Sequence, residues 1–295
     1  MALLAGALLL ILLRRLLHPR FWRALALLAS LSALILALGR LGDPPTAGFL
    51  AGWDLGGGTL RQPTFRDGLD SRPFALFATL VLAAWTGHRV LAGTGSPGIA
   101  KGLGVGAAAL FFLDADDPLS VALAWGGLDL LLLAIALTAR NPPDSRLVRR
   151  AALWSLLGLT AWLGAALLPQ FATEAGLLRT VALWIRLGLY PAHSLWLLAG
   201  GISRGLTGVL PPLVLAAGGG LLVREGWPPL AEPFSALVGG VALAVVARGL
   251  VGLWWGRAAE EGLGWVIQAQ LGWLVLALAI GGSWPRPTSS GRPWP

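Results

Sequence analysis

Apolar runs of about 20 residues, built mainly from Leu, Ala and Gly, recur along this chain and limit what it can fold into. A helix of that length crosses the roughly 30 Å hydrocarbon core of a bilayer. The chain has 295 residues and a mean hydropathy of +0.73, and only 12% of its residues are charged. A soluble protein of this length needs more charge to cover its surface. The pattern therefore predicts an all-α, polytopic membrane protein.

The apolar segments predict a bundle of about ten transmembrane spans. The first and the fourth segments are short for a span, and the longest polar stretch, residues 40–72, is too short for a separate soluble domain. Residues 1–283 are therefore expected to form a single transmembrane bundle. Residues 284–295 are rich in Pro, Gly and Ser, which predicts an exposed tail. The predicted spans cover residues 2–13, 22–39, 73–93, 102–113, 119–139, 151–168, 177–198, 206–223, 234–254 and 262–282.

The distribution of charge predicts the orientation of these spans. If the N-terminus lies outside, the inner loops contain most of the Lys and Arg residues. The outer loops then contain most of the acidic residues, including the sequence DADD at positions 114 to 117. Cytoplasmic loops of membrane proteins are rich in Lys and Arg, so an N-out, C-out arrangement is expected.

Several chemistries have no candidate residues in this sequence. The chain has no Cys and only three His, without an HExxH motif or a carboxylate cluster, so neither a cofactor nor a bound metal is expected. There is no glycine-rich phosphate loop and no Ser/His/Asp signature, so no self-contained catalytic site is expected. The basic residues are scattered between apolar segments, which does not indicate a nucleic-acid partner.

Two charged residues fall inside predicted spans. Asp129 lies near the middle of the fifth span and Arg186 lies in the seventh. A charge at the centre of a bilayer costs about 3 kcal/mol on insertion scales and normally faces the protein interior or a water-filled cavity. The two residues therefore indicate either part of an ion pathway or a static ion pair.

Proline and histidine follow Arg186 closely. A proline inside a helix removes a backbone donor and kinks the helix, so Pro191 is expected to interrupt the seventh span. The freed carbonyl needs water or a protein partner, and His193 is placed to exchange protons there or to serve as a structural hydrogen-bonding residue. Pro211 marks a second expected break in the next span.

Four stretches of the chain resemble, in order, the antiporter-like membrane subunits of respiratory NADH–quinone oxidoreductase (complex I). That family also includes subunits of Mrp-type cation/proton antiporters and of membrane-bound hydrogenases. The third-helix stretch contains DGL, where the family has D-G-L-S, and the fifth-helix stretch contains WGGL in place of W-E-G-L. The seventh-helix stretch, RLGLYPAHSLWL, is similar to K-x-x-x-x-P-x-H-x-W, and the tenth-helix stretch keeps Q-L-G. The four stretches are residues 65–84, 113–133, 186–197 and 260–282.

The resemblance implies an all-helical bundle with a discontinuous seventh helix and a proton half-channel. In the family this half-channel uses a Glu on helix five and a Lys on helix seven. By position the Lys falls on Arg186 and the Glu falls on Gly126. Asp129 lies three residues after Gly126, on the same helical face, and can stand in for the missing carboxylate. His193 matches the histidine of the P-x-H motif.

The chain departs from the family at several further points. An ionisable residue common on helix eight falls near Pro211, and a lysine of the loop before the tenth helix falls on Glu260. Family members usually have about fourteen helices with inverted repeats, whereas ten spans are expected here. Arginine does not deprotonate, so Arg186 cannot pass on a proton as a lysine can.

The resemblance implies a membrane subunit of a multi-subunit, complex I-like, ion-translocating complex that contributes a proton half-channel. The alternatives are a degenerate structural subunit of such a complex, or the membrane partner in an Mrp-like antiporter or an inorganic-carbon uptake system. The expected partners are other membrane subunits, the lipid bilayer, and a soluble redox or non-redox protein. The expected location is the bacterial inner (cytoplasmic) membrane, with a thylakoid-type membrane as the alternative.

Overall fold

The computed structural model describes nine helices. The residues it describes are 18–42, 70–93, 96–139, 144–168, 171–189, 191–192, 208–225, 233–255 and 259–281, with single positions 65, 68, 206 and 228. The helices are α2 (Pro19–Gly39), α3 (Arg72–Leu91), α4 (Ser96–Leu113), α5 (Pro118–Leu137), α6 (Ser145–Leu167), α7 (Ala172–Arg186), α9 (Leu210–Glu225), α10 (Phe234–Trp255) and α11 (Ala259–Gly281).

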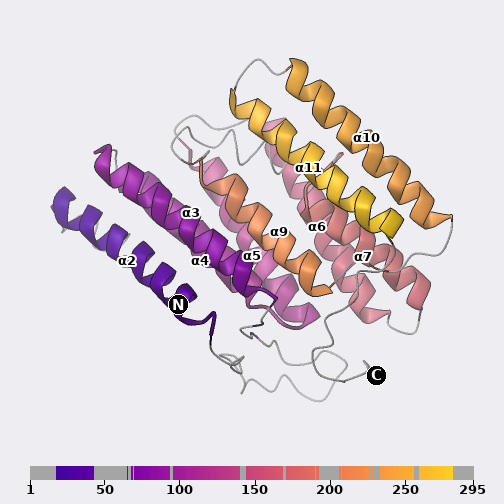
Figure 1. The fold of residues 1–295 in the computed structure, drawn as a ribbon, viewed down its shortest axis with the longest axis horizontal. Coiled ribbons are helices and arrows are strands. Elements are labelled where there is room, and N and C mark those ends of the chain that lie inside the picture. The colour runs from indigo at the N-terminus through magenta and orange to yellow at the C-terminus, as the bar shows by residue number, and fades with distance from the viewer. Residues whose placement is uncertain are drawn as a thin grey trace.

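The helices run side by side as one bundle, with α2 at one edge and α10 at the other (Figure 1). Helices adjacent in the chain pack together, as α2 does with α3, α6 with α7 and α10 with α11. Helix α9 packs against α3 and α4, which are far from it in sequence. The described part of the chain contains no strand, and its one extended contact is an isolated bridge between Phe65 and Ala115. The predicted all-α class is therefore confirmed.

Five of the described helices are long and apolar enough to cross a membrane. These are Arg20–Gly39, Arg72–Leu91, Pro118–Leu137, Ser145–Leu167 and Phe234–Trp255. Two shorter apolar helices, Gly98–Leu113 and Gly264–Ala279, accompany them. The predicted first span, 2–13, and the predicted tail, 284–295, lie outside the described residues. The number of ten spans and the N-out, C-out orientation stay predictions.

Helix α6 is longer than the sequence pattern predicted. It begins at Ser145, six residues before the predicted span 151–168, because the side chain of Asp144 accepts a hydrogen bond from the backbone N–H of Arg146 and caps the helix. The first turns of α6 therefore contain arginines that the apolar pattern had assigned to a loop.

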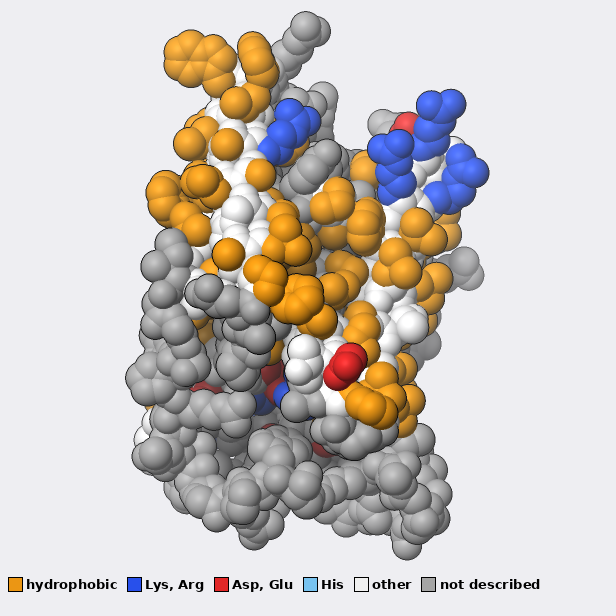
Figure 2. Space-filling view, turned by 90° about the vertical axis from the view of Figure 1, so that its right-hand side faces the viewer, with side chains coloured by type: hydrophobic (Ala, Val, Ile, Leu, Met, Phe, Trp, Pro, Cys, Tyr) orange, Lys and Arg blue, Asp and Glu red, His pale blue; other side chains and the backbone are white. Residues whose placement is uncertain are grey.

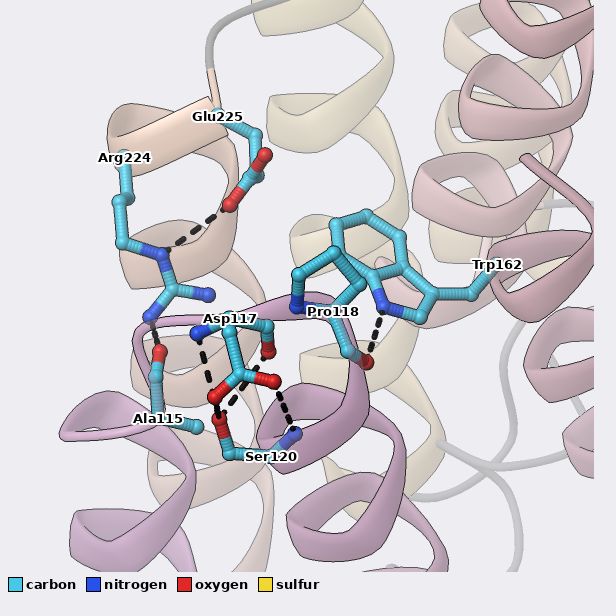
Figure 3. A network of polar contacts seen from close by, with 7 residues as sticks. All are labelled: Ala115, Asp117, Pro118, Ser120, Trp162, Arg224 and Glu225. Atoms are coloured by element: carbon cyan, nitrogen blue, oxygen red, sulfur yellow. Dashed lines mark hydrogen bonds and ion pairs between the residues drawn. The ribbon is translucent and has the colours of Figure 1, made fainter. Parts of the chain in front are cut away.

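Polar contacts at the start of α5 join three helices (Figure 3). Asp117 and Ser120 form a capping box, in which each side chain accepts a hydrogen bond from the other residue's backbone N–H. Trp162 of α6 donates to the carbonyl of Pro118 at 3.0 Å, and Arg224 of α9 donates to the carbonyl of Ala115. These contacts hold α5, α6 and α9 at one end of the bundle.

Large apolar side chains cover much of the outer surface. Leu28 on α2, Leu130 on α5 and Leu156 on α6 are each more than 60% exposed. Figure 2 shows hydrophobic side chains over most of the described part of one face, with Lys and Arg side chains gathered at one end. Exposed apolar surface of this extent is expected for helices that face lipid.

Candidate functional site

Helix α7 ends at Arg186, before it reaches Pro191. Gly188 adopts a φ of 64°, in the left-handed region that glycine tolerates best. The N–H of Gly188 donates to the carbonyl of Ile185 at 2.9 Å, and the N–H of Leu189 donates to that of Trp184 at 3.2 Å. This pair of hydrogen bonds is a Schellman motif, which closes the end of a helix.

Neither of the two prolines at the predicted helix breaks lies in the interior of a described helix. Pro191 follows the last residue of α7 by five positions, and Pro211 is the second residue of α9, within its first turn. A proline in the first turn of a helix removes an N–H that has no intrahelical partner in any case. His193 and the second part of the predicted discontinuous helix lie outside the described residues.

The C-terminal end of α7 lies inside the bundle. Helix α7 has 15 residues, so it is about 22 Å long and shorter than the roughly 30 Å hydrocarbon core. Its C-terminal residue, Arg186, contacts Asp129 near the middle of α5. An α-helix therefore ends beside the midpoint of its neighbour, inside the bundle.

Arg186 and Asp129 form a buried ion pair. The Nη1 atom of Arg186 lies 2.9 Å from Oδ1 of Asp129, and the two side chains are 0% and 3% exposed. Arg186 also lies in the last turn of α7, where a positively charged side chain interacts favourably with the helix dipole. The two predicted intramembrane charges are therefore brought together.

The second oxygen of Asp129 is held by two neighbours. Trp125 Nε1, one turn earlier on α5, donates to Oδ2 at 2.8 Å. Ser155 Oγ of α6 donates to the same oxygen at 2.5 Å. Three helices thus place a donor around one carboxylate, and both of its oxygens accept hydrogen bonds.

The guanidinium of Arg186 contacts two aromatic rings that pack edge to face against each other. Its Cζ atom is 4.8 Å from the ring centroid of Phe112 on α4 and 5.1 Å from that of Trp125. Cation–π attraction partly replaces the lost hydration of the cation. The Nε and Nη2 atoms are buried and have no hydrogen-bond partner among the residues that the structure describes. The site therefore contains buried donors that could bind a water molecule.

Glycines allow the helices to approach closely around the pair. A Cβ atom at Gly158 of α6 would lie 2.8 Å from Trp125 and 2.9 Å from Ile185. A Cβ atom at Gly218 of α9 would lie 3.3 Å from Leu187 and 3.6 Å from the carbonyl oxygen of Arg186. Small residues at these two positions therefore bring α6 and α9 against the end of α7.

Helix α11 also reaches the end of α7. The buried Gln268 side chain donates a hydrogen bond from Nε2 to the carbonyl of Gly188. Sequence reasoning missed Gln268, and it also missed Ser155, Trp125 and Phe112. Trp125 carried a usable signal, because it lies four residues before Asp129 on the same helical face. Phe112, Ser155 and Gln268 lie on α4, α6 and α11, and only the folded structure shows which residues of these helices face the site.

This arrangement restricts the chemistry of the site. Asp129 is the group of the pair that can gain or lose a proton, whereas Arg186 stays charged. Within the described ranges no group of three or more His, Cys, Asp or Glu side chains could hold a metal ion. The site is therefore a fixed cation beside a carboxylate, enclosed by aromatic rings and hydroxyl and indole donors.

The fold and the site define a class: an all-helical bundle with helices long and apolar enough to cross a membrane and a buried ion pair at the end of a helix that stops inside the bundle. Solved structures with this fold were found. A chain of respiratory complex I from Thermus thermophilus, solved with bound aureothin, matches 95% of the present chain with 23% identity and a TM-score of 0.67. A chain of the archaeal membrane-bound sulfane sulfur reductase matches 94% with 14% identity and a TM-score of 0.74.

A chain of the Mrp complex from Dietzia sp. DQ12-45-1b matches 95% of the present chain with 18% identity and a TM-score of 0.73. No protein-family model and no curated protein matches the chain. The present chain spans 64%, 63% and 34% of the lengths of these complex I, sulfane sulfur reductase and Mrp chains. The resemblance to complex I and Mrp subunits predicted from the sequence is therefore confirmed at the level of the fold.

Proposed function

We propose that this chain is a membrane subunit of a multi-subunit, ion-translocating complex and that it contributes a proton pathway through Asp129. Arg186 is the fixed cation of this pathway, and His193, which follows the interruption in sequence, is its second titratable group. The observation that carries the proposal is the buried Arg186–Asp129 pair, 2.9 Å apart, at the end of a helix that stops inside the bundle.

The position of the pair supports a role in transport. Burying an ion pair in a membrane requires desolvation of both ions, and such pairs in membrane helices mark ion and proton pathways. The helix end also leaves non-helical backbone at Leu187–Leu189, inside the bundle. Irregular backbone at membrane depth is found where it is enclosed by protein or lines a water-filled cavity.

The contacts around Asp129 define what proton transfer requires. Oδ2 of Asp129 accepts two hydrogen bonds and Oδ1 accepts one, so the second lone pair of Oδ1 is the position at which the carboxylate can accept a proton. The Nε and Nη2 atoms of Arg186, which have no hydrogen-bond partner in the described part of the chain, provide a place for a water molecule beside the carboxylate. We propose that such water connects Asp129 to the segment that contains His193.

One observation favours a second function, that of a structural subunit. Both oxygens of Asp129 are already occupied by three donors, and Arg186 cannot lose its proton. A pair held in this way joins α5, α6 and α7 without any transfer of protons. In this alternative the chain packs beside the translocating subunits of the same complex.

Proton flux in the assembled complex separates these two functions. The complex is purified with tagged wild-type chain, reconstituted into liposomes and assayed for proton uptake with a pH-sensitive dye. Asp129→Asn keeps the size of the side chain but removes the titratable group and one of its two acceptor oxygens, whereas Asp116→Asn makes the same change at an exposed position. A pathway predicts that Asp129→Asn abolishes the flux and Asp116→Asn preserves it. Normal flux in an assembled Asp129→Asn complex would establish the structural function.

The kind of complex is identified by its other subunits. The tagged chain is purified in mild detergent, and the copurifying proteins are identified by mass spectrometry. Iron–sulfur proteins would place the chain in a redox-driven complex of the complex I or hydrogenase type. Recovery with only antiporter-like chains, or with a soluble non-redox protein, would favour an Mrp-like or inorganic-carbon uptake system.

A further inference from the structure

Three arginines share one face of the first two turns of α6. Arg146, Arg149 and Arg150 are related by spacings of three and four residues, which place side chains next to one another on a helix. All three are exposed, and none of them forms an ion pair with a residue in the described ranges. The nearby Asp144 caps the helix through the backbone N–H of Arg146. Like charges four residues apart destabilise a helix.

A hollow of about 530 Å³ adjoins these arginines. It is lined by Arg146, Arg149, Arg150 and Leu153. Figure 2 shows that Lys and Arg side chains lie at one end of this face, whereas hydrophobic side chains cover most of its described remainder. This surface is open to the outside, and Leu153 lines it together with the three arginines.

The same face of α6 continues as an apolar strip. Leu153, Leu156 and Leu157 follow the arginines at helical spacing and are 57%, 63% and 47% exposed. Ser155, which contacts Asp129, lies on the opposite, buried face of α6. One exposed helical face thus presents three cations and then, about one to two turns further on, three leucines.

We propose that this face of α6 binds an anionic phospholipid. The guanidinium groups of Arg146, Arg149 and Arg150 bind the phosphate of the headgroup, because the planar guanidinium matches phosphate geometry with two parallel hydrogen bonds. The acyl chains lie along Leu153, Leu156 and Leu157. Basic pockets beside membrane helices bind anionic headgroups in this way. The leucines favour a lipid over free phosphate, because an inorganic anion gains nothing from an apolar strip.

The experiment measures lipid binding to the purified, delipidated complex that contains the full chain. Phosphatidylglycerol, phosphatidylcholine and inorganic phosphate are titrated separately, and binding is followed by native mass spectrometry and by thermal stability in detergent. Binding of phosphatidylglycerol at least tenfold tighter than that of phosphatidylcholine is expected. Inorganic phosphate should raise thermal stability less than phosphatidylglycerol at the same concentration.

Two double variants locate the site. Arg149→Gln with Arg150→Gln should weaken phosphatidylglycerol binding at least fivefold, because it removes two of the three guanidinium groups. Arg20→Gln with Arg23→Gln removes the same charge from α2 and should leave binding unchanged. Equal weakening by the two double variants would overturn the proposal, because it would show a general effect of positive charge.

The apolar part of the site is tested in the same assay. Leu153→Ser with Leu156→Ser should also weaken phosphatidylglycerol binding, while the response to inorganic phosphate stays unchanged. Both leucines are exposed in the described fold, so the variants are expected to fold, and circular dichroism checks this. Unchanged lipid binding in this variant, with inorganic phosphate competing fully, would overturn the lipid proposal and leave a phosphate site.

Discussion

Ser155 on α6 donates a hydrogen bond of 2.5 Å to Oδ2 of Asp129 on α5. The serine is 7% exposed and the aspartate 2%, so water does not compete for this contact. The contact fixes the orientation of the carboxylate, because the opposite oxygen then faces Arg186. Ser155 is uncharged and belongs to no recognised sequence motif, yet its hydrogen bond sets the geometry of the ion pair.

Ser155→Ala is expected to lower the free energy of unfolding by about 1.5–3 kcal/mol, the usual range for a hydrogen bond to a charged group. The loss would be measured by thermal unfolding of the purified protein in detergent. Ser32→Ala is a suitable control, because the Ser32 hydroxyl is exposed and donates to the carbonyl of Ala29 in its own helix. An equal effect of the two substitutions would contradict the assigned role of Ser155.

Removal of one partner of the ion pair should be more severe than removal of both. Asp129→Ala leaves the buried guanidinium of Arg186 without its carboxylate, and a loss of about 3–5 kcal/mol is expected. Asp129→Leu combined with Arg186→Met removes both charges and keeps apolar volume in the core, so it should recover most of that loss. Thermal unfolding of the two variants measures the difference. A double variant less stable than Asp129→Ala would show that the pair itself stabilises the fold.

The close approach of α6 to α5 and α7 depends on Gly158. Gly158→Ala places a methyl group 2.8 Å from Trp125 and 2.9 Å from Ile185, and overpacking of this kind costs about 1–3 kcal/mol. Gly127→Ala provides the matched control, because a Cβ atom at Gly127 has no neighbour within 4 Å. The control should be neutral or slightly stabilising, since alanine favours helix. Unfolding temperatures of the two variants in the same detergent test this difference.

The sequence predicted part of this architecture for clear physical reasons. Long apolar runs require helices in a membrane, so the helical class and the positions of most helices followed from hydropathy. Two isolated charges in apolar helices require a partner, which is why Asp129 and Arg186 could be considered together. The resemblance to complex I and Mrp subunits rested on short motifs in the right order, and the shared fold agrees with it.

The remaining features depend on tertiary contacts that the sequence does not reveal. The chain has 41 glycines, so nothing in the sequence distinguished Gly188 as the residue that closes α7. Proline is a stronger sequence signal than glycine, so the sequence pattern predicts the interruption at Pro191. Ser155 and Gln268 belong to ordinary helical stretches, and their roles arise from the packing of α6 and α11 against the site.

The end of α7 can be tested by a comparison between Gly188 and Pro191. Gly188→Ala forces a β-carbon into a left-handed backbone conformation with a φ of 64° and should cost about 1–2 kcal/mol. Pro191→Ala changes a residue that lies beyond the helix end, so a smaller loss is expected. Thermal unfolding of both variants shows which of the two substitutions destabilises the protein more. If Pro191→Ala is the more destabilising change, proline and not glycine defines the interruption.

Arg186→Lys tests whether the cation of the pair limits proton movement. A lysine at this position keeps the positive charge beside Asp129, but it can lose its proton when it is buried, which arginine cannot do. If the pathway through Asp129 is active, Arg186→Lys should increase proton flux in reconstituted complexes. Arg186→Gln should decrease this flux, because the uncharged side chain no longer supports the carboxylate. In a purely structural subunit neither substitution would change the flux while the complex stays assembled, so proton uptake in these two variants distinguishes a transporting chain from a scaffold.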